Sequence, residues 1–296
     1  MNTQSKTEWT NKRLLEWTAD YLGKAEVEQS RLCAELLLAH VLNWQRIRLY
    51  TDFDYQPSAE QLAEFRGLVK RCGQHEPVAY LTGHAHFYSL DLEVNASVLI
   101  PRPETEVLVT HALDFLRQQT SRPTAYVLDL CTGSGCIAIA LAANVVEADI
   151  LAIDSSGEAL EVARRNVEKY DLQGRIHLLE GDLFATMDQA PCAVFDLIVS
   201  NPPYISTAEF DKLESNVRKY EPSSALLAGA DGLDYYRRMA GEAGEYLADG
   251  GVLMVEVGYN QAREVAGLLE QAGLFKDIKV YKDHLGHGRV VRAAKG

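Results

Sequence analysis

The chain of 296 residues is 47% hydrophobic and 24% charged, a composition typical of a globular protein with a substantial apolar core. Its net charge of −13 argues against direct binding to duplex nucleic acid, because such binding needs a cationic surface that displaces the counterions of the phosphates. The sequence also lacks a signal-peptide pattern and any stretch near the ~20 apolar residues of a membrane span, so we expect a cytoplasmic protein with no membrane partner.

The first part of the chain has helical periodicity. Apolar residues recur at intervals of three and four positions in LLEWTADYL, SRLCAELLLAHVL and SAEQLAEFRGLVKRCG. Ser30 and Ser58 stand where a side chain often caps a helix N-terminus. These features predict a small helical domain over residues 1–83.

Residues 84–100 follow a different pattern. The stretch HAHFYSLDLEVNASVLI alternates apolar with polar residues and contains β-branched side chains, which is typical of short strands. We therefore expect a β-hairpin that links the helical domain to the rest of the chain.

From residue 101 to residue 296, segments typical of strands alternate with amphipathic helices. The predicted strands are AYVLDLC, DILAIDS, RIHLLEG, FDLIVS, GVLMVEVG, FKDIKVY and RVVRAA. Repeated strand–helix units imply a sheet that is covered by helices on both faces. The sequence thus predicts an α/β fold, with a doubly wound, mostly parallel seven-stranded sheet.

The first predicted strand runs into a glycine turn, DLCTGSGCIAIALA. Gly133 and Gly135 allow backbone angles and close approaches that leave the following helix N-terminus open to a ligand. Asp154 ends the next strand, where a carboxylate can accept hydrogen bonds from both ribose hydroxyls. Asp154 has an alternative role as the cap of the following helix. Together the turn and Asp154 favour an adenosine-containing cofactor, without saying which.

The third predicted strand is followed by EGDLF. This position places Asp182 at the border of an adenine site, with Leu183 and Phe184 as candidate walls. Taken alone, Asp182 is equally well explained as a turn residue.

The fourth predicted strand, FDLIVS, runs directly into Asn201-Pro202-Pro203-Tyr204. A planar NH2 group is a poor nucleophile, but the Asn201 side-chain oxygen and the Pro202 carbonyl can accept its two hydrogens while the prolines offer no competing donors. Tyr204 can stack on the planar group. A sulfonium methyl donor then needs in-line positioning, and the nitrogen becomes acidic as the methyl arrives. The alternative is a tight strand exit without chemistry.

Two further segments have structural explanations. In PRPETE, Pro101 and Pro103 constrain the entry to a helix, and a direct contact of this loop with a ligand stays an open alternative. Tyr235, Tyr236 and the arginines that follow them fit the core and solvated faces of an amphipathic helix.

Cysteine and histidine spacing does not predict a metal site. The five cysteines are odd in number and form no CxxC pair, which favours reduced thiols. His84 and His86, like His284 and His287, lie among glycines without further ligand types at metal-binding spacing. We interpret both pairs as surface or loop histidines.

Together, DLCTGSG, Asp154 and NPPY resemble the amino methyltransferases that use S-adenosylmethionine, a group that acts on adenine, cytosine or glutamine. The stretches VLIPRPETE, EPSSALLAGADGLDYYR and DHLGHGRVV, with the helical N-terminal region, are similar to the peptide chain release factor glutamine methyltransferases. This resemblance covers nearly the whole chain.

The resemblance implies transfer of a methyl group to the side-chain nitrogen of the glutamine in the Gly-Gly-Gln motif of class 1 peptide chain release factors. It implies substrate recognition by the helical domain. It also implies that the cofactor is held by Cys131, Thr132, Gly133, Ser134, Gly135, Asp154, Asp182, Leu183 and Asn201, and the glutamine by Asn201, Pro202, Pro203 and Tyr204, of which Asn201, Pro202 and Tyr204 are catalytic. Cys131 stands where a glycine is often expected, and Leu183 where a larger aromatic often lies.

Three other functions fit parts of the pattern. An adenine-N6 methyltransferase acting on DNA or RNA shares NPPY, but it should carry a basic surface, against which the charge of −13 argues. A nicotinamide-dependent oxidoreductase shares the glycine turn and leaves NPPY unexplained. A binding module without turnover would require a dead cofactor site, whereas Gly133, Gly135, Asp154 and Asn201 are intact.

Overall fold

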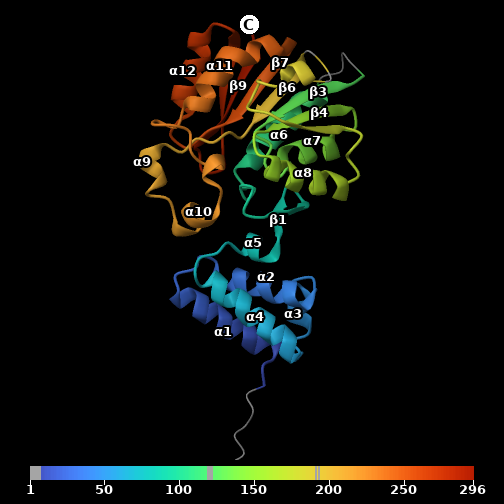
Figure 1. Cartoon of the computed structure of the whole chain (residues 1–296), viewed down its shortest axis with the longest axis vertical. Helices are drawn as coiled ribbons and strands as arrows, with labels where there is room; N and C mark the ends of the chain where they lie inside the picture. Colours follow the sequence, from blue (N-terminus) through green and yellow to red (C-terminus); the bar gives the residue numbers. More distant parts are fainter. Residues whose placement is uncertain (1–7, 119–122, 191, 193) are drawn as a thin grey trace, which may run out of the picture. The chain divides into compact units, whose positions relative to one another are not determined.

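The structure is a computed structural model that describes residues 8–118, 123–190, 192 and 194–296 (Figure 1). It divides into two compact units, Met1–Gly83 and His84–Gly296. The predicted hairpin at 84–100 groups with the second unit. The helices among the described residues are all too short or too polar to cross a membrane.

The N-terminal unit is a helical bundle with one apolar core. Its helices are α1 (Asn11–Lys24), α2 (Ser30–Leu42), α3 (Arg48–Thr51), α4 (Ala59–Cys72) and α5 (Val78–Thr82). The core is formed by fully buried side chains such as Leu15, Leu37 and Leu38. The periodicity predicted α1, α2 and α4; it missed α3 and α5, which are too short for a repeat to show.

The two predicted helix caps have different outcomes. Ser58 caps α4 through a capping box with Gln61, so this prediction is confirmed. The prediction for Ser30 is wrong, because Ser30 is the first residue of α2 and the capping position is held by Gln29 in a left-handed conformation with φ 47°.

The second unit begins with a β-hairpin, in which β1 (His84–Phe87) pairs antiparallel with β2 (Leu90–Glu93). Alternate side chains of the hairpin, Phe87, Leu90 and Leu92, are buried in the core of this unit. The hairpin thus packs on the sheet domain through its apolar face.

The sheet has seven strands in the order β5-β4-β3-β6-β7-β9-β8. The strands are β3 (Ala125–Leu130), β4 (Ala148–Asp154), β5 (Ile176–Glu180), β6 (Phe195–Ser200), β7 (Leu247–Glu256), β8 (Phe275–Lys282) and β9 (Gly288–Lys295). The first five are parallel, and β9 runs antiparallel to both β7 and β8. The predicted α/β fold with a mostly parallel seven-stranded sheet is confirmed.

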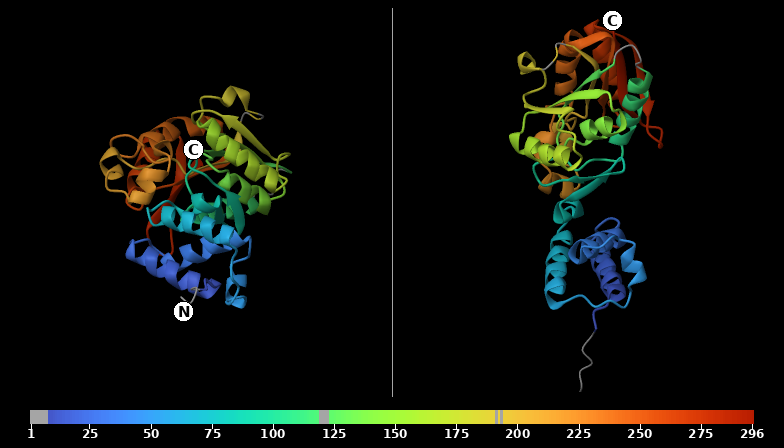
Figure 2. Two further views of the ribbon diagram at one scale, coloured as in Figure 1. Left: turned by 60° about the horizontal axis from the view of Figure 1, so that its bottom comes forward. Right: turned by 90° about the vertical axis from the view of Figure 1, so that its right-hand side faces the viewer.

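Helices cover both faces of this sheet (Figures 1 and 2). One face carries α6 (Thr105–Gln118), α7 (Cys136–Asn144) and α8 (Gly157–Lys169), and the other carries α11 (Asp234–Tyr246) and α12 (Ala262–Ala272). Successive strand residues enter opposite cores, as Val127 and Leu128 do on β3, because side chains alternate along a strand. The short helices α9 (Thr207–Phe210) and α10 (Ser215–Tyr220) lie in the connection between β6 and α11.

The strand order reverses at β3, which lies between β4 and β6. In open α/β sheets the crevice for a ligand forms at the carboxyl ends of the strands beside such a reversal. The glycine turn after β3, Asp154 at the end of β4 and Asn201 after β6 therefore meet at one edge of the sheet.

Candidate active site

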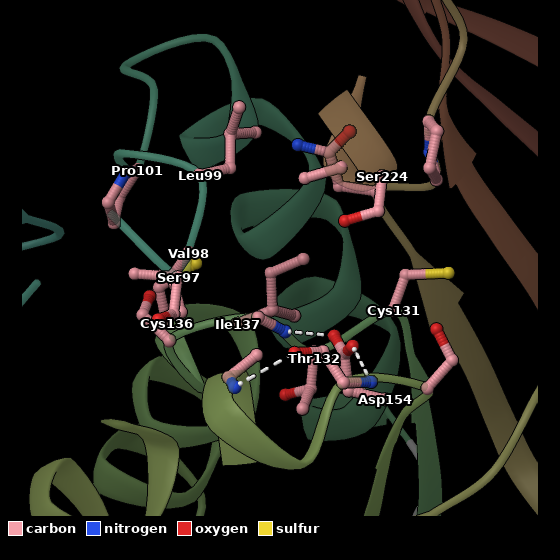
Figure 3. A pocket seen from close by; sticks show the side chains of 18 of the residues that line it. Ser97, Val98, Leu99, Pro101, Cys131, Thr132, Cys136, Ile137, Asp154 and Ser224 are labelled. Atoms are coloured by element: carbon pink, nitrogen blue, oxygen red, sulfur yellow. Dashed lines mark hydrogen bonds between the residues drawn. The ribbon is translucent and has the colours of Figure 1, made fainter. Parts of the chain in front are cut away.

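A cavity of about 880 Å³, its open mouth included, lies at this edge (Figure 3). Most of the predicted site residues line it: Cys131, Thr132, Gly133, Ser134, Asp154, Asp182, Leu183, Asn201 and Pro203. Gly135, Pro202 and Tyr204 do not line its wall.

The two glycines of the turn have different local roles. Both are in the left-handed region, Gly133 with φ 56° and Gly135 with φ 79°. A side chain on Gly133 would meet open space, so its backbone edge faces the cavity unobstructed. A Cβ on Gly135 would lie 3.2 Å from Cδ1 of Ile139 and 3.4 Å from Cβ of Ala163, so this glycine allows α7 to pack closely on α8.

The Asp154 carboxylate links the turn after β3 to the start of α8. Its Oδ2 accepts a hydrogen bond from the Gly133 N–H at 2.8 Å, and its Oδ1 accepts one from the Ser156 N–H at 3.0 Å. The alternative reading of Asp154 as the helix cap is wrong, because the Ser156 hydroxyl caps α8 by accepting from the Ala159 N–H. Burial raises the pKa of Asp154, and the backbone donors oppose this rise.

Two non-glycine residues of the cavity wall have left-handed backbones, Cys131 with φ 59° and Leu183 with φ 54°. Such a conformation costs a non-glycine residue about 1–3 kcal/mol. A glycine at position 131 would avoid this cost. The surrounding fold therefore holds both residues in an unfavourable backbone conformation at the cavity wall.

The structure agrees with only some of the predictions for the residues after β5. The Asp182 carboxylate stands at the cavity and accepts from Nη1 of Arg238 at 2.8 Å, and Leu183 is buried in the wall. The prediction of Phe184 as a second wall is wrong: its ring stacks on Tyr246, with centroids 5.0 Å apart, inside the core. One side of the expected adenine site is thus formed without Phe184.

The loop before α6 closes the cavity from another side, with Ser97, Val98 and Pro101 opposite Cys131 and Asp154 (Figure 3). The buried Glu221 carboxylate holds this loop, since it accepts from the Ile100 N–H at 3.2 Å and forms an ion pair with Arg102. Ser224 and Ala225, which follow Glu221 by three and four positions, also line the cavity. The PRPETE segment therefore borders the site as well as starting a helix.

The NPPY segment is held at both ends. At its start, Nδ2 of Asn201 donates to Oγ1 of Thr105 at 3.1 Å. At its end, the Tyr204 carbonyl accepts from Nε2 of Gln261 at 2.9 Å, and the same nitrogen donates to the Gly232 carbonyl at 3.3 Å. Oε1 of Gln261 accepts from the Gly258 N–H, so both the nitrogen and the oxygen of this buried amide are hydrogen-bonded. Burial raises the pKa of the Tyr204 hydroxyl to about 12.

Both parts of the chain match known protein families. Residues 13–83 match the model of the PrmC N-terminal domain, and residues 105–217 match that of the methyltransferase small domain. A release factor glutamine methyltransferase from Rhodopirellula baltica is 45% identical over 99% of both chains, and one from Geobacter sulfurreducens is 44% identical over 98% of both. The chain belongs to the release factor glutamine methyltransferase family.

A solved structure extends the comparison in fold. The human methyltransferase 10 domain containing protein superposes with a TM-score of 0.52 at 17% identity, over 71% of this chain and 89% of that one. This similarity concerns the methyltransferase fold alone.

The structure adds residues to this candidate site that the sequence does not predict. Thr105, Glu221 and Gln261 are buried polar residues whose partners lie far along the chain, so no local pattern marks them. Tyr235 was expected on a core or solvated face, but it lines the cavity. The same expectation is correct for Tyr236, which is buried and donates from its hydroxyl to the Glu256 carbonyl.

We expect Gly232→Ala to lower the free energy of unfolding by about 2 kcal/mol or more. Gly232 has φ 78°, and a Cβ there would lie 2.4 Å from the Tyr204 carbonyl oxygen. The control is Gly241→Ala on the exposed side of α11, where a Cβ meets open space and should raise helix stability by up to about 1 kcal/mol. Urea unfolding followed by circular dichroism compares them, and equal midpoints for the two variants would contradict the close packing at Gly232.

Proposed function

We propose that this chain transfers the methyl group of S-adenosylmethionine to the side-chain nitrogen of the glutamine in the Gly-Gly-Gln motif of class 1 peptide chain release factors, in the cytoplasm where translation occurs. The observation that carries the proposal is the position of Asn201. Its amide borders the same cavity as the Asp154 carboxylate, and its nitrogen is already bound to Thr105. The amide oxygen is therefore left to accept a hydrogen from a substrate.

The residues of the cavity fit the cofactor. Gly133 presents an unobstructed backbone, and each Asp154 oxygen has lone-pair capacity beyond its one backbone bond, as ribose recognition requires. Residues 131–135, Asp154, Asp182, Leu183 and Asn201 would hold S-adenosylmethionine, with Gly135 acting through the shape of the turn. When bound, the cofactor supplies a methyl group on a positively charged sulfur.

The Asn201 oxygen and the Pro202 carbonyl would accept the two hydrogens of the substrate amide and orient its nitrogen toward the cofactor. Neither Pro202 nor Pro203 has an N–H group to compete for these acceptors. The Tyr204 hydroxyl, with its pKa raised to about 12, stays protonated, so we assign Tyr204 a stacking role and not a base. The proton that leaves the nitrogen passes to solvent, and the rate comes from positioning.

The alternative acceptor, an adenine of DNA or RNA, is not favoured. The family relatives that cover nearly the whole chain are release factor enzymes, and the net charge of −13 opposes binding to a phosphate backbone.

We further propose that the helical unit Met1–Gly83 binds the release factor. Trp17 is 48% exposed and stacks on the partly exposed Tyr21, with ring centroids 5.4 Å apart. These aromatics border an apolar groove between α1 and α4 that is lined by Leu14, Phe65 and Val69, among others. Exposed aromatic rings beside an apolar groove are enriched in protein interfaces, which supports a protein partner.

We expect methylation of an intact class 1 release factor at its Gly-Gly-Gln glutamine and little reaction with free glutamine. Binding of the release factor away from the cavity compensates for the entropy that is lost when its Gly-Gly-Gln loop is fixed, whereas free glutamine lacks this contact. Radiolabelled methyl transfer followed by peptide mapping measures the acceptor. Label on adenine of DNA or RNA, with none on the release factor, would overturn the proposed function.

We expect Asp154→Ala to weaken S-adenosylmethionine binding by roughly 1.5–3 kcal/mol, the usual range for hydrogen bonds to a charged group. Isothermal titration calorimetry measures the affinity. Asp114→Ala, on an exposed position of α6 away from the cavity, is the matched control and should bind normally. Unchanged affinity in a folded Asp154→Ala variant would remove this carboxylate from the cofactor site.

We expect Trp17→Ala to raise KM for the intact release factor about 10-fold, the usual effect of losing an aromatic contact at an interface. Its kcat, and its activity on a short Gly-Gly-Gln peptide, should not change. Ile47→Ala is the control, since Ile47 is 68% exposed on the same unit but lies outside the groove. Equal KM values for the two variants would argue against this groove as the binding surface.

A further inference from the structure

A buried carboxyl group lies behind the NPPY segment, outside the set of residues that line the cavity. Glu256 is the last residue of β7 and is 1% exposed. The Thr105 hydroxyl lies close enough to this carboxyl to lower its pKa, and Thr105 is also 1% exposed and is the first residue of α6. Thr105 in turn contacts Asn201, whose Nδ2 lies 3.1 Å from the Thr105 hydroxyl oxygen. The Thr105 hydroxyl thus lies between a buried acid and the amide at the cavity, and it is hydrogen-bonded to that amide.

The chemistry of the groups fixes the direction of hydrogen bonding among them. An ionised carboxylate can accept but cannot donate, so the single hydroxyl proton of Thr105 goes to Glu256. The Thr105 oxygen is then left as an acceptor. An amide can satisfy that acceptor only with its NH2 group, so Asn201 turns its nitrogen to Thr105 and its Oδ1 away from it.

We propose that Thr105 and Glu256 are positioning residues that hold the Asn201 amide with its oxygen toward the substrate. This inference rests on the proposed function, in which the Asn201 oxygen accepts a hydrogen from the amide that is methylated. If the side-chain amide of Asn201 were flipped, its NH2 group would face the NH2 group of the substrate. Two hydrogen-bond donors cannot form a hydrogen bond with each other. The orientation of the Asn201 amide therefore decides whether the substrate nitrogen that receives the methyl group is bound or repelled.

The surroundings of Glu256 make the orientation of the Asn201 amide depend on the protonation of the Glu256 carboxyl group. Burial raises the pKa of the Glu256 carboxyl to about 7, and Glu104 adds to the rise, whereas the Thr105 hydroxyl and the charges of Arg289 and Arg102 oppose it. The Tyr204 and Tyr236 hydroxyls and the Cys136 thiol also face this charge, and all three have raised pKa values. Oε2 of Glu256 is buried without a hydrogen-bond partner among the described residues. A protonated Glu256 becomes a donor itself, and the hydroxyl proton of Thr105 is then free to point at Asn201.

The first test compares two substitutions of Thr105. Thr105→Val keeps the shape and loses the hydroxyl, whereas Thr105→Ser keeps the hydroxyl. We expect Thr105→Val to lower kcat for release factor methylation by about 10-fold to 100-fold with KM for S-adenosylmethionine changed less than about 3-fold, and Thr105→Ser to keep most of the rate. In an Asn201→Ala background, Thr105→Val should cause no further loss, because the amide that it positions is gone. Equal rates for Thr105→Val and wild type, or equal losses for Val and Ser, would overturn the inference.

The second test uses Glu256. The wild-type kcat should fall as the pH is lowered through about 7, because the ionised form fixes the amide. Glu256→Gln should lose this inflection, since a carboxamide does not titrate in this pH range. Glu242→Gln, on an exposed position of α11, is the control and should keep the wild-type profile. An unchanged profile in Glu256→Gln would remove Glu256 from the assignment.

A spectroscopic measurement separates this inference from the proposed function. The side-chain NH2 signals of Asn201, assigned by their loss in Asn201→Ala, should shift in NMR spectra as the pH crosses about 7 in wild type, and should not shift in Glu256→Gln or Thr105→Val. Wild-type protein that shows this shift yet leaves release factors unmethylated would refute the function and keep the positioning role. Wild-type protein that methylates release factors without the shift would refute the positioning role alone.

Discussion

The parallel pairing of β3 with its two neighbours is the constraint on which the site depends. Leu130 at the end of β3 pairs with Ile153 on β4 and with Ser200 on β6, so the residues that follow these strands emerge at one edge. A slip of one residue in either register would exchange the two faces of a strand and move Asp154 or Asn201 away from the glycine turn. The central strands β3, β4 and β6 bury apolar side chains in both cores, so a slipped strand would have to repack both of its faces.

Buried polar side chains then hold the segments around this edge in place through hydrogen bonds. Asn166 of α8 donates from Nδ2 to the carbonyls of Glu93 and Ser134, both at 2.9 Å, and its Oδ1 accepts from the Glu93 N–H. It thereby ties the hairpin to the glycine turn. Gln261 holds the end of NPPY, and Glu221 holds the loop before α6, in the same manner. Losing one partner of such a bond leaves a buried polar group unsatisfied, which costs about 1–3 kcal/mol.

Carboxylates at and near the cavity suit a methyl donor with a positive charge. Burial raises the pKa of Asp129 to about 7, and its carboxylate accepts from the Thr132 hydroxyl at 2.6 Å, just beneath the glycine turn. Asp154 and Asp182 border the cavity itself. Carboxylates at the cavity favour a sulfonium over a neutral group, whereas they oppose the phosphates of nucleic acid. The electrostatics of the cavity and the net charge of the whole chain therefore favour the same class of cofactor and acceptor.

The sequence by itself determined the sheet, the glycine turn, Asp154 and the NPPY segment. Each is a local pattern, in which periodicity or residue type within a few positions fixes the conformation. Tertiary structure alone decided that Phe184 packs into the core against Tyr246 and that Gln29, not Ser30, precedes α2. It also decided that Thr105 meets Asn201 and that Glu221 meets Arg102. These partners lie far apart along the chain, and a hydrogen bond between distant residues leaves no periodic signal in the sequence, because its geometry exists only after the strands have paired.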